Sequence, residues 1–76
     1  MNDADVTLDA RGLSCPMPIL RTKQALAKMT SGQTLHVIAT DPGSMKDFDA
    51  FCRATGNVLQ QSRAEQGEFH YVLRKA

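Results

Sequence analysis

The feature that most constrains the fold is an alternation of β-type and helix-type patterns within only 76 residues. Val6 and Leu8 alternate with polar neighbours, as a half-buried strand does, and residues 34–40 are rich in β-branched side chains. Between these two segments, residues 16–29 are good helix formers, and Gly32 follows as a stop signal. The whole pattern predicts strands at residues 6–9, 34–40, 58–63 and 69–74, and helices at residues 16–29 and 44–55.

This order, β-α-β-α-β-β, leaves few arrangements of the sheet. A strand–helix–strand unit joins two parallel strands through a right-handed crossover. The turn at Glu65-Gln66-Gly67 instead joins the last two strands as an antiparallel hairpin. Alternation within the strands indicates that one sheet face is covered, so we expect both helices on that face. The prediction is an α/β (α+β) fold: a two-layer sandwich with a four-stranded mixed sheet, forming a single domain over residues 1–76.

Local patterns assign caps and faces to these elements. Ser44 is predicted to be the N-cap of the second helix, with Asp47 three residues later as part of a capping box. His36 and His70 alternate with apolar neighbours in their strands, which predicts that both point to solvent. The predicted apolar faces consist of Ile19, Leu20, Leu26 and Ala27 in the first helix, and of Met45, Phe48, Phe51, Cys52 and Thr55 in the second.

Charge and composition argue against several classes of function. The formal net charge is +1 and the basic residues are dispersed, so we expect no direct contact with nucleic acid. Residues 1–5 lack the basic start of a signal peptide, and no apolar stretch approaches the length of a membrane span. We therefore expect a cytoplasmic protein with reduced thiols. Two cysteines without histidines at ligand spacing predict no metal site, and nothing in the sequence requires a cofactor.

Cys15 is the candidate for chemistry because it stands at the start of the first predicted helix. Pro16 fits the first helical position and Pro18 falls within the first turn, so together they stiffen the segment that carries the thiol. A helix N-terminus favours negative charge, which predicts a lowered pKa for Cys15. The competing interpretation is a buried, small apolar side chain, which is what most free cysteines are.

Other residues of the sequence are weaker candidates than Cys15 for a direct part in the chemistry. Arg11, Arg21 and Lys23 lie close in the sequence and are candidates for electrostatic support of its thiolate. For Lys23, a packed stem with the ammonium in water is the favoured interpretation. Cys52 shares the apolar face of the second helix and is interpreted as core. Neither histidine is well placed in the sequence to serve as a base, so a cysteine hydrolase is not expected.

Segment 8–18, which contains Cys15-Pro16-Met17-Pro18, resembles the signature of the TusA-like (SirA-like) sulfur-carrier family, whose mark is the Cys-Pro-x-Pro motif. The motif alone is short, but its position in so small a chain and its flanking residues make it specific. The resemblance extends over essentially the whole chain, through Gly32 with Leu35 and Val37, Asp41-Pro42 with Asp47-Phe48, and Phe51-Cys52 with Gly56.

The resemblance implies a two-layer fold of the same element order and a sulfurtransferase-type carrier. In that family Cys15 would accept sulfane sulfur as a persulfide and pass it on, while Pro16 and Pro18 would shape its turn. The implied donors are cysteine desulfurases or rhodaneses. The implied acceptors are relay proteins of tRNA thiolation, molybdenum-cofactor assembly or sulfur oxidation. A monomer is the simplest expectation for a protein that docks with two partners in turn.

Two other functions stay open on the sequence. One is a non-enzymatic regulatory module that binds RNA or protein, with Cys15 as a redox sensor. The phenylalanines and Tyr71 are interpreted as core, so no aromatic set is left for stacking on RNA bases. The other is a dithiol redox enzyme, which requires Cys52 to be accessible.

Overall fold

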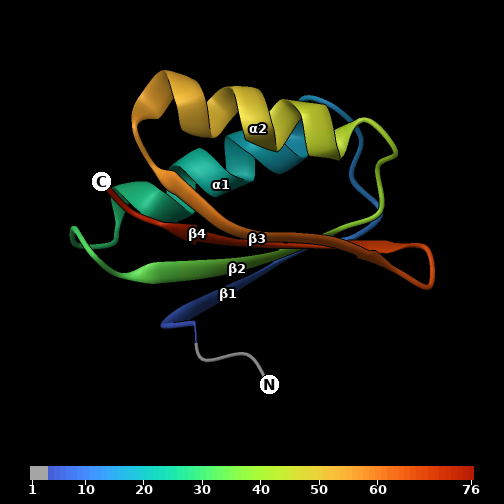
Figure 1. Cartoon of the computed structure of the whole chain (residues 1–76). Helices are drawn as coiled ribbons and strands as arrows, with labels where there is room; N and C mark the ends of the chain where they lie inside the picture. Colours follow the sequence, from blue (N-terminus) through green and yellow to red (C-terminus); the bar gives the residue numbers. More distant parts are fainter. Residues whose placement is uncertain (1–3) are drawn as a thin grey trace.

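The computed structural model describes residues 4–76, in which four strands form one mixed sheet and two helices cover one of its faces (Figure 1). The strand order is β1-β2-β4-β3; β1 and β2 are parallel, and β4 is antiparallel to both of its neighbours. The predicted element order and mixed sheet are therefore confirmed. The elements are β1 (Val6–Ala10), α1 (Met17–Ala27), β2 (Thr34–Ala39), α2 (Ser44–Thr55), β3 (Val58–Glu65) and β4 (Glu68–Arg74).

Two local signals act as predicted. The β3–β4 hairpin turns through Gln66 and Gly67, whose φ angles of 50° and 80° are the positive values that a tight hairpin needs. Helix α2 ends at Gly56, which adopts φ 79° and donates its N–H to the Cys52 carbonyl over 2.9 Å. Glycine suits this conformation because it has no Cβ to clash with the backbone.

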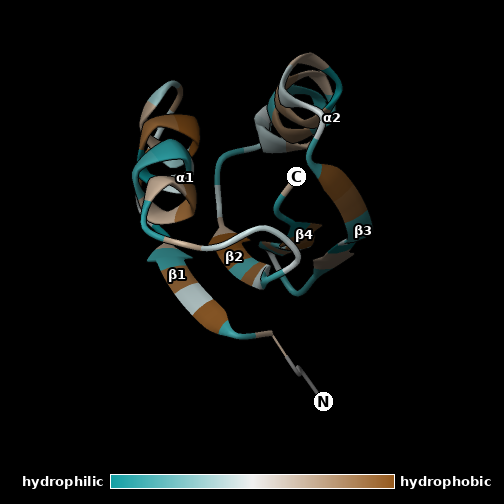
Figure 2. Cartoon of the chain, turned by 90° about the vertical axis from the view of Figure 1, so that its left-hand side faces the viewer, coloured by the Kyte–Doolittle hydropathy of each residue, from teal (hydrophilic) through white to brown (hydrophobic). Residues whose placement is uncertain are grey.

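The core lies between the sheet and the two helices. Figure 2 shows the molecule from its end, with α1 above the β1 side and α2 above the β3 side of the sheet. Phe48 of α2 stacks on Tyr71 of β4 with ring centroids 4.4 Å apart, and both side chains are fully buried. A stacked pair of this kind stabilises a fold by about 0.5–1.5 kcal/mol beyond its buried area. The other buried apolar residues are Ala10, Leu26, Met29, Leu35, Val37, Ala39, Cys52 and Leu73.

The buried stripe of α1 is narrower than the sequence predicts. Pro18, Thr22 and Leu26, spaced by four residues, are buried, whereas Leu20 is 42% exposed and Ala27 is also exposed. Thr22 is accommodated because its hydroxyl donates to the Pro18 carbonyl over 2.8 Å. The helix covers the β1 side of the sheet, so the flanks of the predicted apolar face are left to solvent.

The start of α2 also differs from the prediction. Ser44 is the first helical residue rather than the N-cap, a position that Gly43 occupies without a side-chain hydrogen bond. The Ser44 hydroxyl is instead buried and lies 2.6 Å from the Tyr71 hydroxyl. It faces the sheet because the Tyr71 hydroxyl needs a partner when buried. Met45 and Thr55, which the spacing assigned to the apolar face, are exposed.

His36 points to the sheet face that the helices leave uncovered, but it is not exposed to solvent as predicted, because β2 is a central strand. Strand β2 is flanked by β1 and β4, so Thr7 and Val72 stand beside His36 in register, and the side chain is left only 7% exposed. Its Nε2 lies 2.9 Å from Nδ1 of His70, and the two rings stack. Burial lowers the pKa of His36, with the charge of His70 as a smaller cause.

Candidate functional site

The site lies where the carboxyl ends of the parallel strands β1 and β2 meet. The loop after β1 carries Cys15, and the turn after β2 carries Asp41. Because parallel neighbours end at the same edge of a sheet, these two segments lie side by side. The N–H of Gly12 donates to the Thr40 hydroxyl over 2.9 Å and ties the loop to the turn.

Cys15 stands just outside α1. The helix begins at Met17, Pro16 occupies the cap position, and the Cys15–Pro16 peptide bond is cis. The thiol is exposed, so the interpretation of Cys15 as a buried apolar side chain is wrong. Pro18 is buried beneath the first turn, while Pro16 remains at the surface. The two prolines thus lie on either side of the first helical residue.

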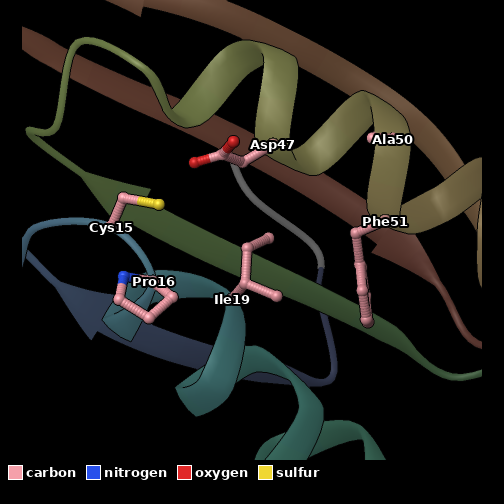
Figure 3. Close-up of a pocket in the computed structure, with 6 residues that line it drawn as sticks. All are labelled: Cys15, Pro16, Ile19, Asp47, Ala50 and Phe51. Carbon is pink, nitrogen blue, oxygen red and sulfur yellow. The ribbon is translucent and has the colours of Figure 1, made fainter.

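A groove of 380 Å³ between α1 and α2 opens at the Cys15 sulfur (Figure 3). The floor and walls are apolar, with one carboxylate, that of Asp47, at the same end as the thiol. The sulfur of Cys15 and the carboxylate of Asp47 point toward one another in Figure 3. The residues that line the groove are Cys15, Pro16, Ile19, Asp47, Ala50 and Phe51.

The pKa of Cys15 is raised rather than lowered, contrary to the sequence prediction. The largest cause is its hydrogen bond with the Asp47 carboxylate, followed by the negative charge of Asp47, by burial and by the charge of Asp41. The helix start offers little to oppose these effects. Pro16 and Pro18 have no N–H, and the Met17 N–H donates to the Ser14 carbonyl over 2.8 Å.

The basic residues named from the sequence do not appear among the groups that set the pKa of Cys15. Arg11 bonds the two carboxylate oxygens of Asp9 over 2.9 and 3.0 Å and reaches Glu68 over 3.2 Å. This partnership lowers the pKa of Asp9 to about 2. Arg21 and Lys23 are exposed side chains of α1, and their support for a charged sulfur stays a prediction.

Cys52 lies in the core, as predicted. Its side chain is 5% exposed on the inner face of α2, and burial is the main cause that raises its pKa. Both cysteines are free thiols. A dithiol couple would require Cys52 to leave its packed position.

Residues 4–76 contain neither a candidate metal site nor a candidate membrane-spanning helix. No group of three or more histidine, cysteine, aspartate or glutamate side chains is arranged to hold a metal ion in this part of the chain. Neither of its helices is long and apolar enough to span a membrane.

Comparison with known proteins identifies the family. Residues 6–75 match the family model described as sulfurtransferase TusA. The chain belongs to the TusA family. It is 60% identical over 76 residues to the sulfur carrier protein TusA of Allochromatium vinosum, with both chains covered completely. The crystal structure of a SirA-like protein from Desulfitobacterium hafniense superposes with a TM-score of 0.75 at 26% identity, covering 91% of this chain and 95% of the other.

These matches confirm the family that the sequence resembles, and they confirm the predicted fold class. Membership in a family of sulfur carriers supports a sulfur-carrier role for this chain. A sulfur carrier receives sulfur from one protein and gives it to another, so the role implies a donor and an acceptor.

Asp47 is the residue of the site that the sequence interpretation missed. It was assigned to a capping box, but no side chain caps α2. A usable signal was present in the parallel pairing expected for the first two strands. That pairing places the segments after both strands at one edge, and Asp47 lies one helical turn into the second of them.

Proposed function

We propose that the chain carries sulfane sulfur as a persulfide on Cys15 and relays it from a donor protein to an acceptor protein. The observation that carries this proposal is an exposed thiol at the open end of an apolar groove, in a member of a sulfur-carrier family. An exposed position is required because two different proteins must reach the same sulfur atom. Cys15 is the thiol of the chain that meets this requirement; Cys52 is buried.

The transfer is an exchange of sulfur–sulfur bonds. The Cys15 sulfur attacks the outer sulfur of a persulfide on the donor, one S–S bond forms while the donor's S–S bond breaks, and the donor leaves as a thiol. The thiol of an acceptor then attacks the outer sulfur on Cys15 in the same way. Neither step needs an oxidant or a reductant, so a carrier with one reactive thiol and no cofactor is sufficient.

Cysteine desulfurases and rhodaneses are the donors we propose, since both classes present sulfur on a cysteine. The proposed acceptors are relay proteins of tRNA thiolation, molybdenum-cofactor assembly or sulfur oxidation. A reducing compartment such as the cytoplasm suits this chemistry because it keeps Cys15 free of disulfides. Docking with two partners in turn is simplest for a monomer.

The test is intact-protein mass spectrometry after incubation with a cysteine desulfurase and cysteine, or with a rhodanese and thiosulfate. We expect one added sulfur atom on the wild type and on Cys52→Ala, and none on Cys15→Ser. The added sulfur is expected to disappear on treatment with a reductant, since a persulfide is reducible. Gain of sulfur by Cys15→Ser would contradict the proposal.

A further inference from the structure

Asp47 holds a position at the site that its helix does not explain. It lies in the first turn of α2, where an acidic side chain often serves as a cap, yet α2 has no side-chain cap. The carboxylate instead lines the groove at the same end as Cys15 and points toward its sulfur (Figure 3). The side chain is half-buried, so one part of it faces the groove and another faces water.

We propose that Asp47 is a catalytic residue of sulfur uptake, whose carboxylate accepts the Cys15 proton as the sulfur attacks the donor persulfide. This inference rests on the proposed function, because it concerns the step in which Cys15 gains sulfur. It assigns a chemical task to a second residue, where the Cys-Pro-x-Pro segment supplies only the nucleophile and its turn.

The arrangement places a carboxylate, which can act as a base, beside the nucleophilic thiol. A carboxylate that accepts the S–H of Cys15 keeps the empty carrier in the thiol form, because a thiolate beside it would be repelled. A protonated nucleophile hydrogen-bonded to an ionised base is the starting arrangement of general base catalysis. The resting thiol is also protected, since oxidants and electrophiles react with the thiolate.

The other titratable groups around Cys15 are less suited to this task. Asp41 acts on Cys15 through its charge without a hydrogen bond. Arg21 and Lys23 on α1 and Lys46 on α2 are exposed side chains that carry hydrogen-bond donors and offer no acceptor. The two histidines lie on the opposite face of the sheet, because each alternates with core residues of its strand, and their ring nitrogens bond each other.

The proton and the electron pairs balance within the two proteins. The thiol proton passes to Asp47 as the Cys15 sulfur bonds the outer sulfur of the donor persulfide. The electron pair of the broken S–S bond leaves with the donor's inner sulfur, which takes the proton back from Asp47 and departs as a thiol. No group outside the carrier and its donor takes part. An internal base matters here because a docked donor excludes the water that would otherwise accept the proton.

The experiment compares Asp47→Asn with Asp49→Asn, a matched loss of one carboxylate from the same helix. Asp49 is exposed, pairs with Arg53 over 3.1 Å, and is neither in the groove lining nor among the groups that shift the pKa of Cys15. In the Cys52→Ala background, two rates are measured for each variant: alkylation of Cys15 by iodoacetamide across pH, and single-turnover uptake of sulfur from a persulfidated cysteine desulfurase.

We expect Asp47→Asn to move the two rates in opposite directions. Alkylation at neutral pH becomes several-fold faster and its pH midpoint falls, because the repelling charge is gone and water serves as base for a small reagent. Sulfur uptake becomes slower by about 10²-fold or more, at the low end of the range for a lost general base. Asp49→Asn leaves both rates as in the parent protein.

Two results would overturn the assignment. One is an unchanged pH midpoint of alkylation in Asp47→Asn, which would mean that the carboxylate does not act on the thiol. The other is uptake that stays the same or accelerates with alkylation, which would leave Asp47 as a group that only suppresses the thiolate. Thermal unfolding confirms that the variant is folded, and Asp47→Ser replaces it if it is not. Failure of the proposed function looks different: the parent protein itself would gain no sulfur on Cys15.

Discussion

Cys15 and Cys52 are the two thiols of one small chain, and they differ in their surroundings rather than in the direction of their pKa shift. Both have a raised pKa, but for different reasons. For Cys15 the main cause is the hydrogen bond with Asp47 at the surface; for Cys52 it is burial in the core. A raised pKa therefore does not distinguish the exposed thiol from the buried one, whereas access to solvent does.

Helix α2 contributes to both environments because successive helical residues point in different directions. Asp47 faces the groove and Cys15, while its neighbour Phe48 and, four residues later, Cys52 face the sheet. A rotation of about 100° per residue is enough to place a polar site and a dry core on adjacent positions. The geometry of the site thus depends on the packing of α2, which Phe48 and Tyr71 hold in place.

The largest expected difference between the two thiols is their rate of labelling in the folded protein. With a bulky maleimide at neutral pH, we expect Cys52 to react at least about 10³-fold more slowly than Cys15. Labelling of Cys52 requires opening of the core, and the free energy of unfolding of a domain is about 5 kcal/mol or more. Peptide mapping after a short pulse measures both rates. Comparable labelling rates would mean that Cys52 is as accessible as Cys15, and would favour the dithiol redox enzyme.

The fold and the exposed position of the Cys15 thiol could be predicted because local patterns determine them. The turn at Gly67, the stop at Gly56 and the strand alternation each act within a few residues, and helical spacing alone places Cys52 in the core. Cys15 was found through the prolines that follow it and through resemblance to a family. The prediction that Cys15 carries sulfur rests on that resemblance, since the physical pattern indicates only an accessible thiol.

The sequence predictions that proved wrong concern features that depend on contacts between distant segments. The prediction of a lowered Cys15 pKa considered the helix start but not Asp47, which lies 32 residues further along the chain. His36 was predicted to face solvent because alternation reports a face of the sheet, not whether a strand is central. Ser44 was assigned as a cap because its need to bond Tyr71 is not visible before the strands are assembled.

A smaller difference is expected when each cysteine is replaced by serine. Cys52→Ser is expected to lower the free energy of unfolding by about 1–3 kcal/mol, because it places a hydroxyl in an apolar core. Cys15→Ser is expected to change it by no more than about 0.5 kcal/mol, as is usual for an exposed position. Urea unfolding of both variants and of Cys52→Ala, which adds no polar group, gives the measurement. Equal losses for the two serine variants would contradict a core position for Cys52.

The smallest expected effect is the response of each thiol to salt, and it tests the two causes of the raised pKa directly. Part of the effect on Cys15 is the charge of Asp47 and Asp41 at the surface, which salt screens. The Debye length falls to about 3 Å at 1 M salt. Burial of Cys52 does not depend on salt in this way. The thiolate absorbance of Cys52→Ala and of Cys15→Ser, titrated at low and at 1 M salt, reports each thiol separately.

We expect the midpoint for Cys15 to fall in high salt without losing all of its elevation, because the hydrogen bond with Asp47 is not removed by screening. The midpoint for Cys52 is expected to stay in place. The same titration on Asp47→Asn in the Cys52→Ala background is the control, and its salt dependence is expected to be smaller because only Asp41 remains to be screened. A Cys15 titration midpoint that does not change with salt would mean that the charges of Asp47 and Asp41 contribute nothing to its raised pKa. The contrast with Cys52 would then rest on access to solvent and on the hydrogen bond alone.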